Sequence, residues 1–163
     1  MSSGKRADKA PKKSRRKARE FGVQGLYQWK LTGGDADTIL SQLREEKEYP
    51  KIDEEHLAVL VRGVIGQAQE LDVLITPYLD RPAGDLSPVE HAILLLATFE
   101  MKHHPEIPYR VIINEAVELA KTYGGTDGHK FVNGVLDKLA AQVRVAEVNA
   151  KLEPQRHRGT EKN

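Results

Sequence analysis

Apolar residues recur every three or four positions along most of the chain, which is the spacing of amphipathic helices. The longest run, in residues 54–75, begins after Asp53 and ends before Pro77. No segment shows the alternation of a strand. The chain is therefore predicted to be all-α, with six to seven helices in two three-helix bundles. The five shorter runs predict helices within 14–31, from Asp35 or Asp37 to before Tyr49, from Ser87 through Phe99, over 111–123, and from Asp127 to about 143.

Turn-forming residues divide these helices into two groups. Residues 77–86 contain two prolines and a glycine, and they predict a connector between a helical subdomain over 14–76 and a second one over 87–146. Residues 1–13 have no periodic apolar positions, so a disordered basic extension is expected there. Residues 147–163 are expected to form a polar tail.

The first predicted helix follows a dense basic run, and its two sides differ. Ser14 is the expected N-terminal cap. Cations around an aromatic ring favour a surface that binds phosphates and stacks a base, although an ordinary solvated helix face is the alternative. One side is apolar, with Ala18, Phe21, Gly22, Gly25 and Trp29, and with Leu26 at its margin. The other side holds Arg16, Arg19, Glu20, Val23, Tyr27 and Lys30.

Charge is distributed unevenly along the chain. Residues 1–20 carry a net charge of +7, residues 151–163 carry +2, and the segment between them carries −8. A basic arm on an acidic body favours a polyanionic partner. There is no cysteine and no apolar run of the ~18 residues that a membrane span needs, and the N-terminus is charged. We therefore expect a soluble cytoplasmic protein with no membrane partner.

Candidate catalytic and metal-binding patterns are weak. His103 and His104 are adjacent, so on a helix they diverge, and no third ligand stands at a useful spacing. The carboxylate pairs lie on polar helix faces, and no hydrolase, zinc-protease or cysteine-nucleophile motif occurs. We expect no catalysis, no cofactor and no metal.

The segment from Gly124 to Lys130 is a candidate anion-binding site. It places a helix N-terminus beside Lys130, which predicts a local anion site, with Tyr123 and Phe131 flanking it as possible stacking rings. The alternative is a plain helical turn in which Phe131 belongs to the core. It is not a nucleotide loop, because it lacks a preceding strand and the required order of residues.

Three segments resemble the NusB family of bacterial transcription antitermination factors. They are SRRKAREFGVQGLYQWKL, SPVEHAILLLATFEM and, above all, PYRVIINEAVELAKTYGGTDGHKFVNGVLDKLA. The resemblance extends over about residues 14–142. It implies a fold of two perpendicular three-helix bundles, in agreement with the periodicity.

The resemblance also implies a function. Family members bind the boxA segment of ribosomal RNA leaders as single-stranded RNA, together with the small-subunit ribosomal protein NusE. That complex joins RNA polymerase, with other Nus factors, and suppresses premature termination. The implied RNA-binding residues are Arg15, Arg16, Lys17, Arg19, Tyr27, Tyr78, Tyr123, Asp127, Lys130 and Phe131, and Glu90 is the implied contact to NusE.

Two positions depart from the family pattern. Lys17 replaces an arginine, which keeps the charge but loses bidentate geometry toward phosphate. Gly25 replaces an expected alanine and should loosen the first helix by roughly 0.5–1 kcal/mol.

Two alternatives to this function remain open. A NusB-like domain also accompanies ribosomal RNA methyltransferases. Such an enzyme needs an α/β cofactor domain and a nucleophilic cysteine, but this chain is expected to be too short for that domain and it has no cysteine. The other alternative is a structural helical homodimer without RNA affinity. Binding of a boxA-like RNA distinguishes the antitermination factor, which should bind it, from the structural homodimer, which should not.

Overall fold

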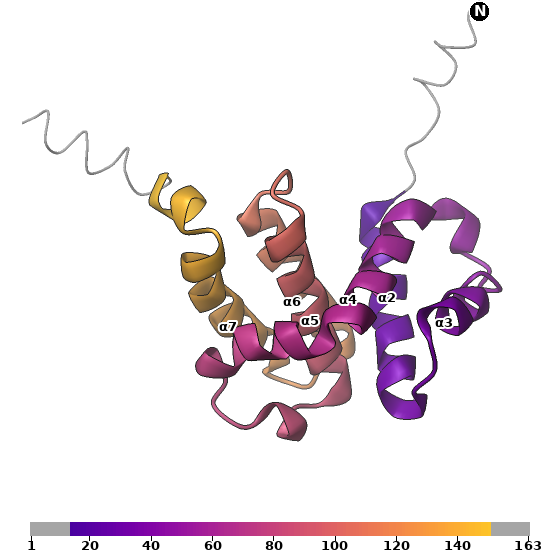
Figure 1. Cartoon of the computed structure of the whole chain (residues 1–163), viewed down its shortest axis with the longest axis horizontal. Helices are drawn as coiled ribbons and strands as arrows, with labels where there is room; N and C mark the ends of the chain where they lie inside the picture. The colour runs from indigo at the N-terminus through magenta and orange to yellow at the C-terminus, as the bar shows by residue number, and fades with distance from the viewer. Residues whose placement is uncertain (1–13, 151–163) are drawn as a thin grey trace, which may run out of the picture.

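The computed structural model describes residues 14–150, and over this range the chain is helical with no β-strand (Figure 1). Three single-turn 3-10 helices, η1 (Tyr49–Lys51), η2 (Thr76–Tyr78) and η3 (Ala83–Asp85), lie between the longer elements. Residues 145–150 are also helical. The all-α prediction is confirmed. The named α-helices are α2 (Arg15–Thr32), α3 (Ala36–Leu43), α4 (Glu54–Ile75), α5 (Pro88–His103), α6 (Tyr109–Tyr123) and α7 (Gly128–Val143).

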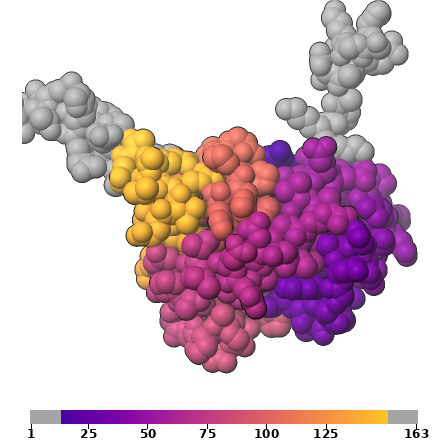
Figure 2. All heavy atoms as spheres, viewed as in Figure 1, coloured from indigo at the N-terminus to yellow at the C-terminus, as the bar shows by residue number. Residues whose placement is uncertain are grey.

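Helix α4 crosses the middle of the molecule, between α2 and α3 on one side and α5, α6 and α7 on the other (Figure 1). Its backbone departs from helical geometry at Gln67, where the helix is kinked. In the space-filling view the two groups of helices meet along α4 (Figure 2). The predicted extension, residues 1–13, and most of the predicted tail lie outside the described residues. Within 14–150, none of the helices is sufficiently long and apolar to cross a membrane.

Side-chain caps start most of the helices where the sequence predicts them. Ser14, Asp53 and Ser87 accept hydrogen bonds from the N–H groups of the third residue after each of them. For α3 the cap is Asp35, and not Asp37. At α7 the predicted position is correct, since Asp127 is the residue before the helix, but its side chain makes no capping hydrogen bond.

Apolar side chains form two core clusters, and α2 lies between them. Ala18 and Phe21 pack in a cluster with α3 and the start of α4, whereas Val23 and Leu26 pack in the larger cluster with α4 and α5. Trp29 packs against both clusters. Helix α2 therefore buries two sides, because it is covered by α3 and α4 on one and by α5 on the other.

This packing corrects three predictions for α2. Arg19 and Val23, expected on the exposed side, are only 5% and 2% exposed. Trp29, on the side predicted to be apolar and therefore buried, is only half-buried. At Gly25 a Cβ atom would lie 2.9 Å from Cγ2 of Ile39, so the glycine lets α3 approach α2 closely.

Candidate functional site

The first residues of α2 are held against the start of α4. The Ser14 N–H donates to the Lys51 carbonyl over 3.1 Å, and the Asp53 N–H donates to the Ser14 carbonyl over 3.2 Å. Asp53 caps α4, and its Oδ2 atom lies 3.6 Å from Nε of Arg15. The basic residues at the start of α2 are therefore presented from a fixed position.

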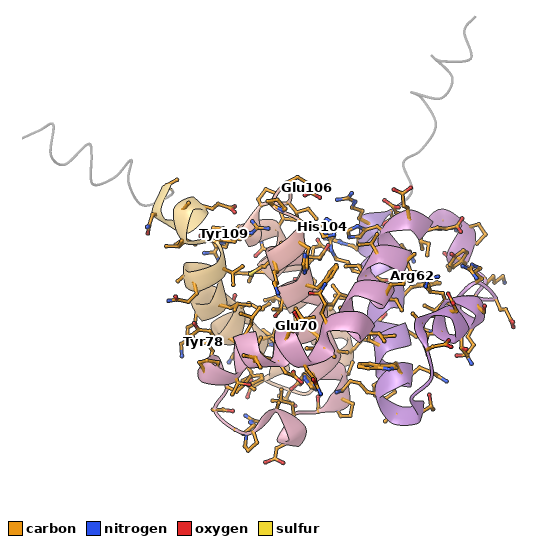
Figure 3. All side chains as sticks on the ribbon, in the orientation of Figure 1. Arg62, Glu70, Tyr78, His104, Glu106 and Tyr109 are labelled. Atoms are coloured by element: carbon orange, nitrogen blue, oxygen red, sulfur yellow. The ribbon has the colours of Figure 1, made fainter. Side chains whose placement is uncertain are left out.

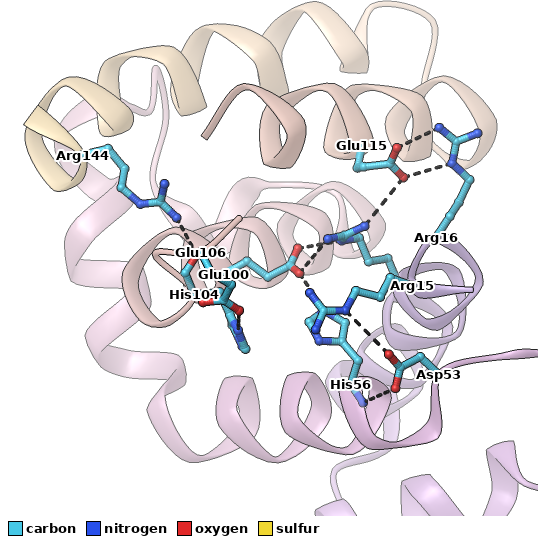
Figure 4. A network of polar contacts seen from close by, with 10 residues as sticks. Arg15, Arg16, Asp53, His56, Glu100, His104, Glu106, Glu115 and Arg144 are labelled. Carbon is cyan, nitrogen blue, oxygen red and sulfur yellow. Dashed lines mark hydrogen bonds and ion pairs between the residues drawn. The ribbon is translucent and has the colours of Figure 1, made fainter. Parts of the chain in front are cut away.

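Arg15, Arg16 and Lys17 are exposed by 45%, 64% and 41% of their side chains, yet each is paired with a carboxylate. Arg16 donates from Nε and Nη2 to the two carboxylate oxygens of Glu115, over 3.1 and 2.7 Å (Figure 4). Lys17 Nζ lies 3.9 Å from Oε1 of Glu48. The pair of Lys17 and Glu48 is exposed on both sides and therefore weak, whereas Glu115 is only 16% exposed, so a phosphate group displaces the partner of Lys17 at smaller cost than the partner of Arg16.

Arg19, by contrast, is part of a buried network. Its Nε and Nη2 atoms donate to the two oxygens of Glu100 over 2.8 and 3.0 Å, and Nε2 of His56 donates to Glu100 over 2.8 Å. A carboxylate only accepts, so Nε2 of His56 carries the proton. The close-up shows Glu100 facing His56 within this network (Figure 4). The network ties α2, α4 and α5 together, and it occupies the guanidinium group of Arg19.

The electrostatics of Glu100 follow from these contacts. Burial raises the pKa of the Glu100 carboxyl, but the hydrogen bonds from His56 and Arg19 and the charge of Arg19 outweigh burial and leave the pKa below its ordinary value. Glu100 is only 1% exposed and remains charged at neutral pH. Arg19 therefore has a structural role in this fold.

A pocket of about 400 Å³ lies between α2, the start of α5 and the end of α6. Tyr27 and Tyr123 are 40% and 47% exposed at this pocket, and burial, with a smaller effect of the Glu20 charge, raises the pKa of the Tyr123 hydroxyl. Two exposed rings beside one pocket can stack planar groups. The residues that line the pocket are Glu20, Val23, Gln24, Tyr27, Val89 and Tyr123.

The loop between α6 and α7 is fixed by Glu90. Oε2 of Glu90 accepts a hydrogen bond from the Gly125 N–H over 3.0 Å, and a Cβ atom at Gly128 would collide with the Glu90 carboxylate. Glu90 thus places negative charge at the N-terminus of α7, where the helix dipole favours it. The anion site predicted there from sequence already contains a carboxylate of the same chain.

Asp127 and Lys130 lie at the exposed start of α7. Asp127 Oδ1 is 3.5 Å from Lys130 Nζ, and their side chains are 74% and 73% exposed. Both groups are free to exchange this contact for another partner, because such a pair is weak in water.

Phe131 follows Lys130 in the first turn of α7, and Tyr78 lies in η2, which contacts α7. Both are half-buried against the larger core cluster, and the guanidinium group of Arg81 lies 5.0 Å above the Phe131 ring. Figure 3 shows Tyr78 at the end of α4 that is remote from Arg62. The alternative that Phe131 packs in the core is thus partly correct, and its ring also carries a cation.

The structure therefore brings the predicted residues together in two groups. The start of α2 and the tyrosine pocket share helices α2 and α6, and Phe131 and Tyr78 share the corner of η2 and α7. Glu90 is adjacent to both, because Val89 lines the pocket and the Glu90 charge acts on Arg81. Arg19 alone among the predicted cations is buried away from solvent.

Sequence reasoning missed Glu115 and Arg81. Glu115 precedes Tyr123 by eight residues, about two helical turns, so the periodicity of α6 could have placed it on the same face. Arg81 stands three residues after Tyr78 in the connector, but nothing local indicates its contact with Phe131.

The two adjacent histidines make separate contacts. His103 Nε2 is 2.7 Å from Oε1 of Gln67, and His104 Nδ1 is 2.9 Å from Oε2 of Glu106. His104 and Glu106 lie side by side in Figure 3. In the part of the chain that the structure describes, no group of three His, Asp or Glu side chains is arranged to hold a metal ion.

Comparison with known proteins assigns the family. The family model described as NusB matches residues 16–141. The chain belongs to the NusB family. It is 61% identical over 134 residues to a transcription antitermination protein NusB of Nitrosospira multiformis, covering 82% of this chain and 85% of that protein. The corresponding protein of Bordetella pertussis is 55% identical over 141 residues, covering 84% of this chain and 92% of that protein.

Solved NusB structures share the fold. A NusB structure from T. maritima superposes with a TM-score of 0.74 at 34% identity, covering 81% of this chain and 94% of that one. A structure of the antitermination factors NusB and NusE in complex with double-stranded RNA gives a TM-score of 0.67 at 26% identity, covering 77% and 94%. The predicted family and its helical fold are confirmed.

Proposed function

We propose that this protein is a cytoplasmic, non-catalytic transcription antitermination factor. In this role it binds boxA-type single-stranded RNA of ribosomal RNA transcripts together with ribosomal protein NusE, and the complex suppresses premature termination by RNA polymerase. The observation that carries the proposal is the similarity to NusB antitermination proteins over more than four-fifths of the chain. The solved complex of a structurally similar NusB with NusE and RNA supports both partners.

The start of α2 supplies the positive charge for RNA in this proposal. Arg15, Arg16 and Lys17 contact phosphates after exchanging their carboxylate partners, and Lys130 adds a cation at the start of α7. Each phosphate contact releases counterions and makes binding dependent on salt. Arg19 is a positioning residue instead, because Glu100 occupies its guanidinium group.

The aromatic residues supply the contacts to bases. Tyr27 and Tyr123 offer exposed ring area at the pocket, whereas Phe131, which lies beside Arg81, and Tyr78 are half-buried and offer less. Stacking on an aromatic side chain contributes about 1–3 kcal/mol per base and tolerates different bases.

Glu90 is the proposed contact to NusE. Its carboxylate also fixes the loop that precedes α7, through the hydrogen bond from the Gly125 N–H. A NusE residue that engages Glu90 therefore acts on a loop next to the RNA-binding residues Asp127 and Lys130. By linkage, NusE and RNA must then raise each other's affinity by the same factor.

The test uses RNA titrations at three salt concentrations on the full chain. Replacing Arg16 with alanine should weaken the binding of all single-stranded RNAs similarly. It should also reduce the slope of log affinity against log salt concentration by about 0.7. Replacing Tyr27 with alanine should cost about 1–3 kcal/mol of RNA binding and leave the salt slope nearly unchanged. Arg62→Ala is the control, because Arg62 on α4 is also an exposed arginine paired with a carboxylate, Asp37 in the first turn of α3.

Two results would contradict these assignments. If a folded Tyr27→Ala protein binds RNA with unchanged affinity, the Tyr27 ring is not part of the RNA site. Equal effects of Arg16→Ala and Arg62→Ala on the salt slope show that RNA contacts are not concentrated at the start of α2.

Double-stranded RNA is a second candidate ligand, because it is present in the solved complex of the similar NusB and NusE. The tyrosine pocket favours a single strand, since a base paired within a duplex cannot stack on a protein ring. Competition between a boxA-like single strand and the same sequence as a duplex decides between the two ligands. Stronger binding of the duplex would overturn the single-strand assignment.

A further inference from the structure

The tyrosine pocket contains the carboxylate of Glu20, whose charge acts on Arg16 and on Tyr123. Glu20 is half-buried at this pocket, and no hydrogen bond or ion pair of its side chain occurs within residues 14–150. Gln24, one helical turn further along α2, is equally without a hydrogen bond in the described part of the chain. The half-buried Glu20 side chain stands among Val23, Val89 and the tyrosine rings, whereas Gln24 is exposed to solvent.

The surroundings of the pocket suit a nucleotide. A volume of about 400 Å³ is ample for one planar base, and Tyr27 and Tyr123 supply ring faces. Arg16 is one helical turn before Glu20 on α2, and its side chain is 64% exposed. A base stacked at the tyrosines therefore has a cation nearby for its own or a neighbouring phosphate.

The carboxylate restricts which base the pocket accepts. An ionised carboxylate can accept hydrogen bonds but cannot donate. Cytosine, adenine and guanine each carry an exocyclic amino group that donates, whereas uracil has one N–H between two carbonyl oxygens. A carboxylate that faces the edge of uracil therefore meets at least one oxygen, and this contact is repulsive.

We propose that this pocket holds a single nucleobase that bears an exocyclic amino group, with Glu20 accepting a hydrogen bond from that group and Gln24 pairing with the adjacent ring atom. Glu20 and Gln24 are then the specificity-determining residues of the pocket, and Tyr27 and Tyr123 supply sequence-tolerant stacking. The inference rests on the proposed RNA-binding function and adds a base preference to it.

The experiment compares oligocytidylate with oligouridylate of equal length, because the two differ at the base edge and are both pyrimidines. The wild-type protein should bind oligocytidylate at least about fivefold more tightly, which is the lower end of the discrimination that a paired base edge gives. Glu20→Gln keeps the side-chain volume and adds a donor, so the preference should fall toward equal binding, mainly through tighter binding of oligouridylate.

Glu45→Gln is the matched control. Glu45 is an exposed carboxylate in the turn after α3, away from the pocket, so this variant removes one negative charge without changing the base edge contact. This variant should bind both RNAs slightly more tightly and leave the ratio of the two affinities unchanged. Thermal melts of both variants establish that any change is not due to unfolding.

The outcomes separate this inference from the function on which it rests. Equal binding of the two homopolymers by the wild type, or an unchanged preference in Glu20→Gln, overturns the base assignment even if a boxA-like RNA still binds. A change in affinity for NusE without a change in RNA preference assigns the pocket to the protein partner and also overturns it. Failure of every RNA to bind contradicts the proposed function itself.

Discussion

Replacing Glu100 with glutamine removes one charge from the centre of the fold while keeping the side-chain volume. Glu100 is 1% exposed and accepts three hydrogen bonds, two from Arg19 and one from His56. These contacts join helices α2, α4 and α5, and through them the two core clusters. We therefore expect the Glu100→Gln protein to fold but to lose much of its stability.

The magnitude follows from the contacts. A glutamine keeps one acceptor oxygen and replaces the other with an NH₂ group, so in either orientation one N–H of Arg19 faces a donor. Arg19 has a side chain only 7% exposed, so its charge remains buried and poorly compensated. Breaking a buried pair in this way costs about 3–5 kcal/mol. For a chain of this size that corresponds to a decrease in Tm of about 6–20 °C.

The dependence on pH supplies an independent check. The pKa of Glu100 is lower in the folded than in the unfolded chain, so the stability due to its charge is complete above the ordinary value of 4.5 and is lost as the pH falls through the folded pKa. The variant has no such charge. The difference in unfolding free energy between wild type and variant should therefore shrink below about pH 4.5.

The assay is thermal and urea unfolding followed by circular dichroism at pH 7 and at acid pH. Asp37→Asn is the control, because Asp37 pairs with Arg62 at 2.6 Å but both side chains are more than half exposed. It should cost at most about 1 kcal/mol. A loss below about 1 kcal/mol in Glu100→Gln, or a difference that is unaffected by acid, would refute the assigned role of the network.

Two further predictions concern packing and competition for a cation. A Cβ atom at Gly63 would collide with the Phe99 ring, so Gly63→Ala should lower the free energy of unfolding by about 1–3 kcal/mol in urea titrations. Gly134→Ala meets nothing within 4 Å and should instead raise it by up to about 1 kcal/mol, so equal effects would contradict this packing. Glu115→Gln removes the carboxylate partner of Arg16 and should tighten RNA binding, most at low salt; weaker binding in RNA titrations would show that Glu115 helps to orient Arg16.

Local features of the fold were predictable because their causes lie within a few residues. Ser14, Asp53 and Ser87 cap helices through N–H groups only three residues ahead, and a small polar side chain before a periodic run indicates this directly. The helices themselves follow from the spacing of apolar residues. The start of α6 at Tyr109, two residues before the expected Val111, is a boundary shift set by Pro108.

The errors arose where distant segments meet. Periodicity assigns one buried stripe to each helix, but α2 is covered on two sides, so Arg19 and Val23 are buried by α5. The pairing of Arg19 with Glu100 joins residues 81 positions apart, and no local pattern encodes it. Similarly, the carboxylate at the start of α7 comes from Glu90, 35 residues before Gly125, and not from the adjacent Asp127.

The candidate site shows the same division. Residue types along α2 and α6 indicate cations and rings, and the family resemblance indicates their use. The pairing of Arg16 with Glu115 joins residues 99 positions apart, and the pocket between Tyr27 and Tyr123 exists only because α5 brings the two helices together. Such features require the tertiary structure.

Binding of a boxA-like single-stranded RNA to the full chain, compared with a scrambled RNA of the same composition, tests the central claim most directly. The titration is done at moderate salt with and without saturating NusE. We expect tighter binding of the boxA-like RNA and a further gain in affinity when NusE is present. Equal affinity for the two RNAs under both conditions would contradict it.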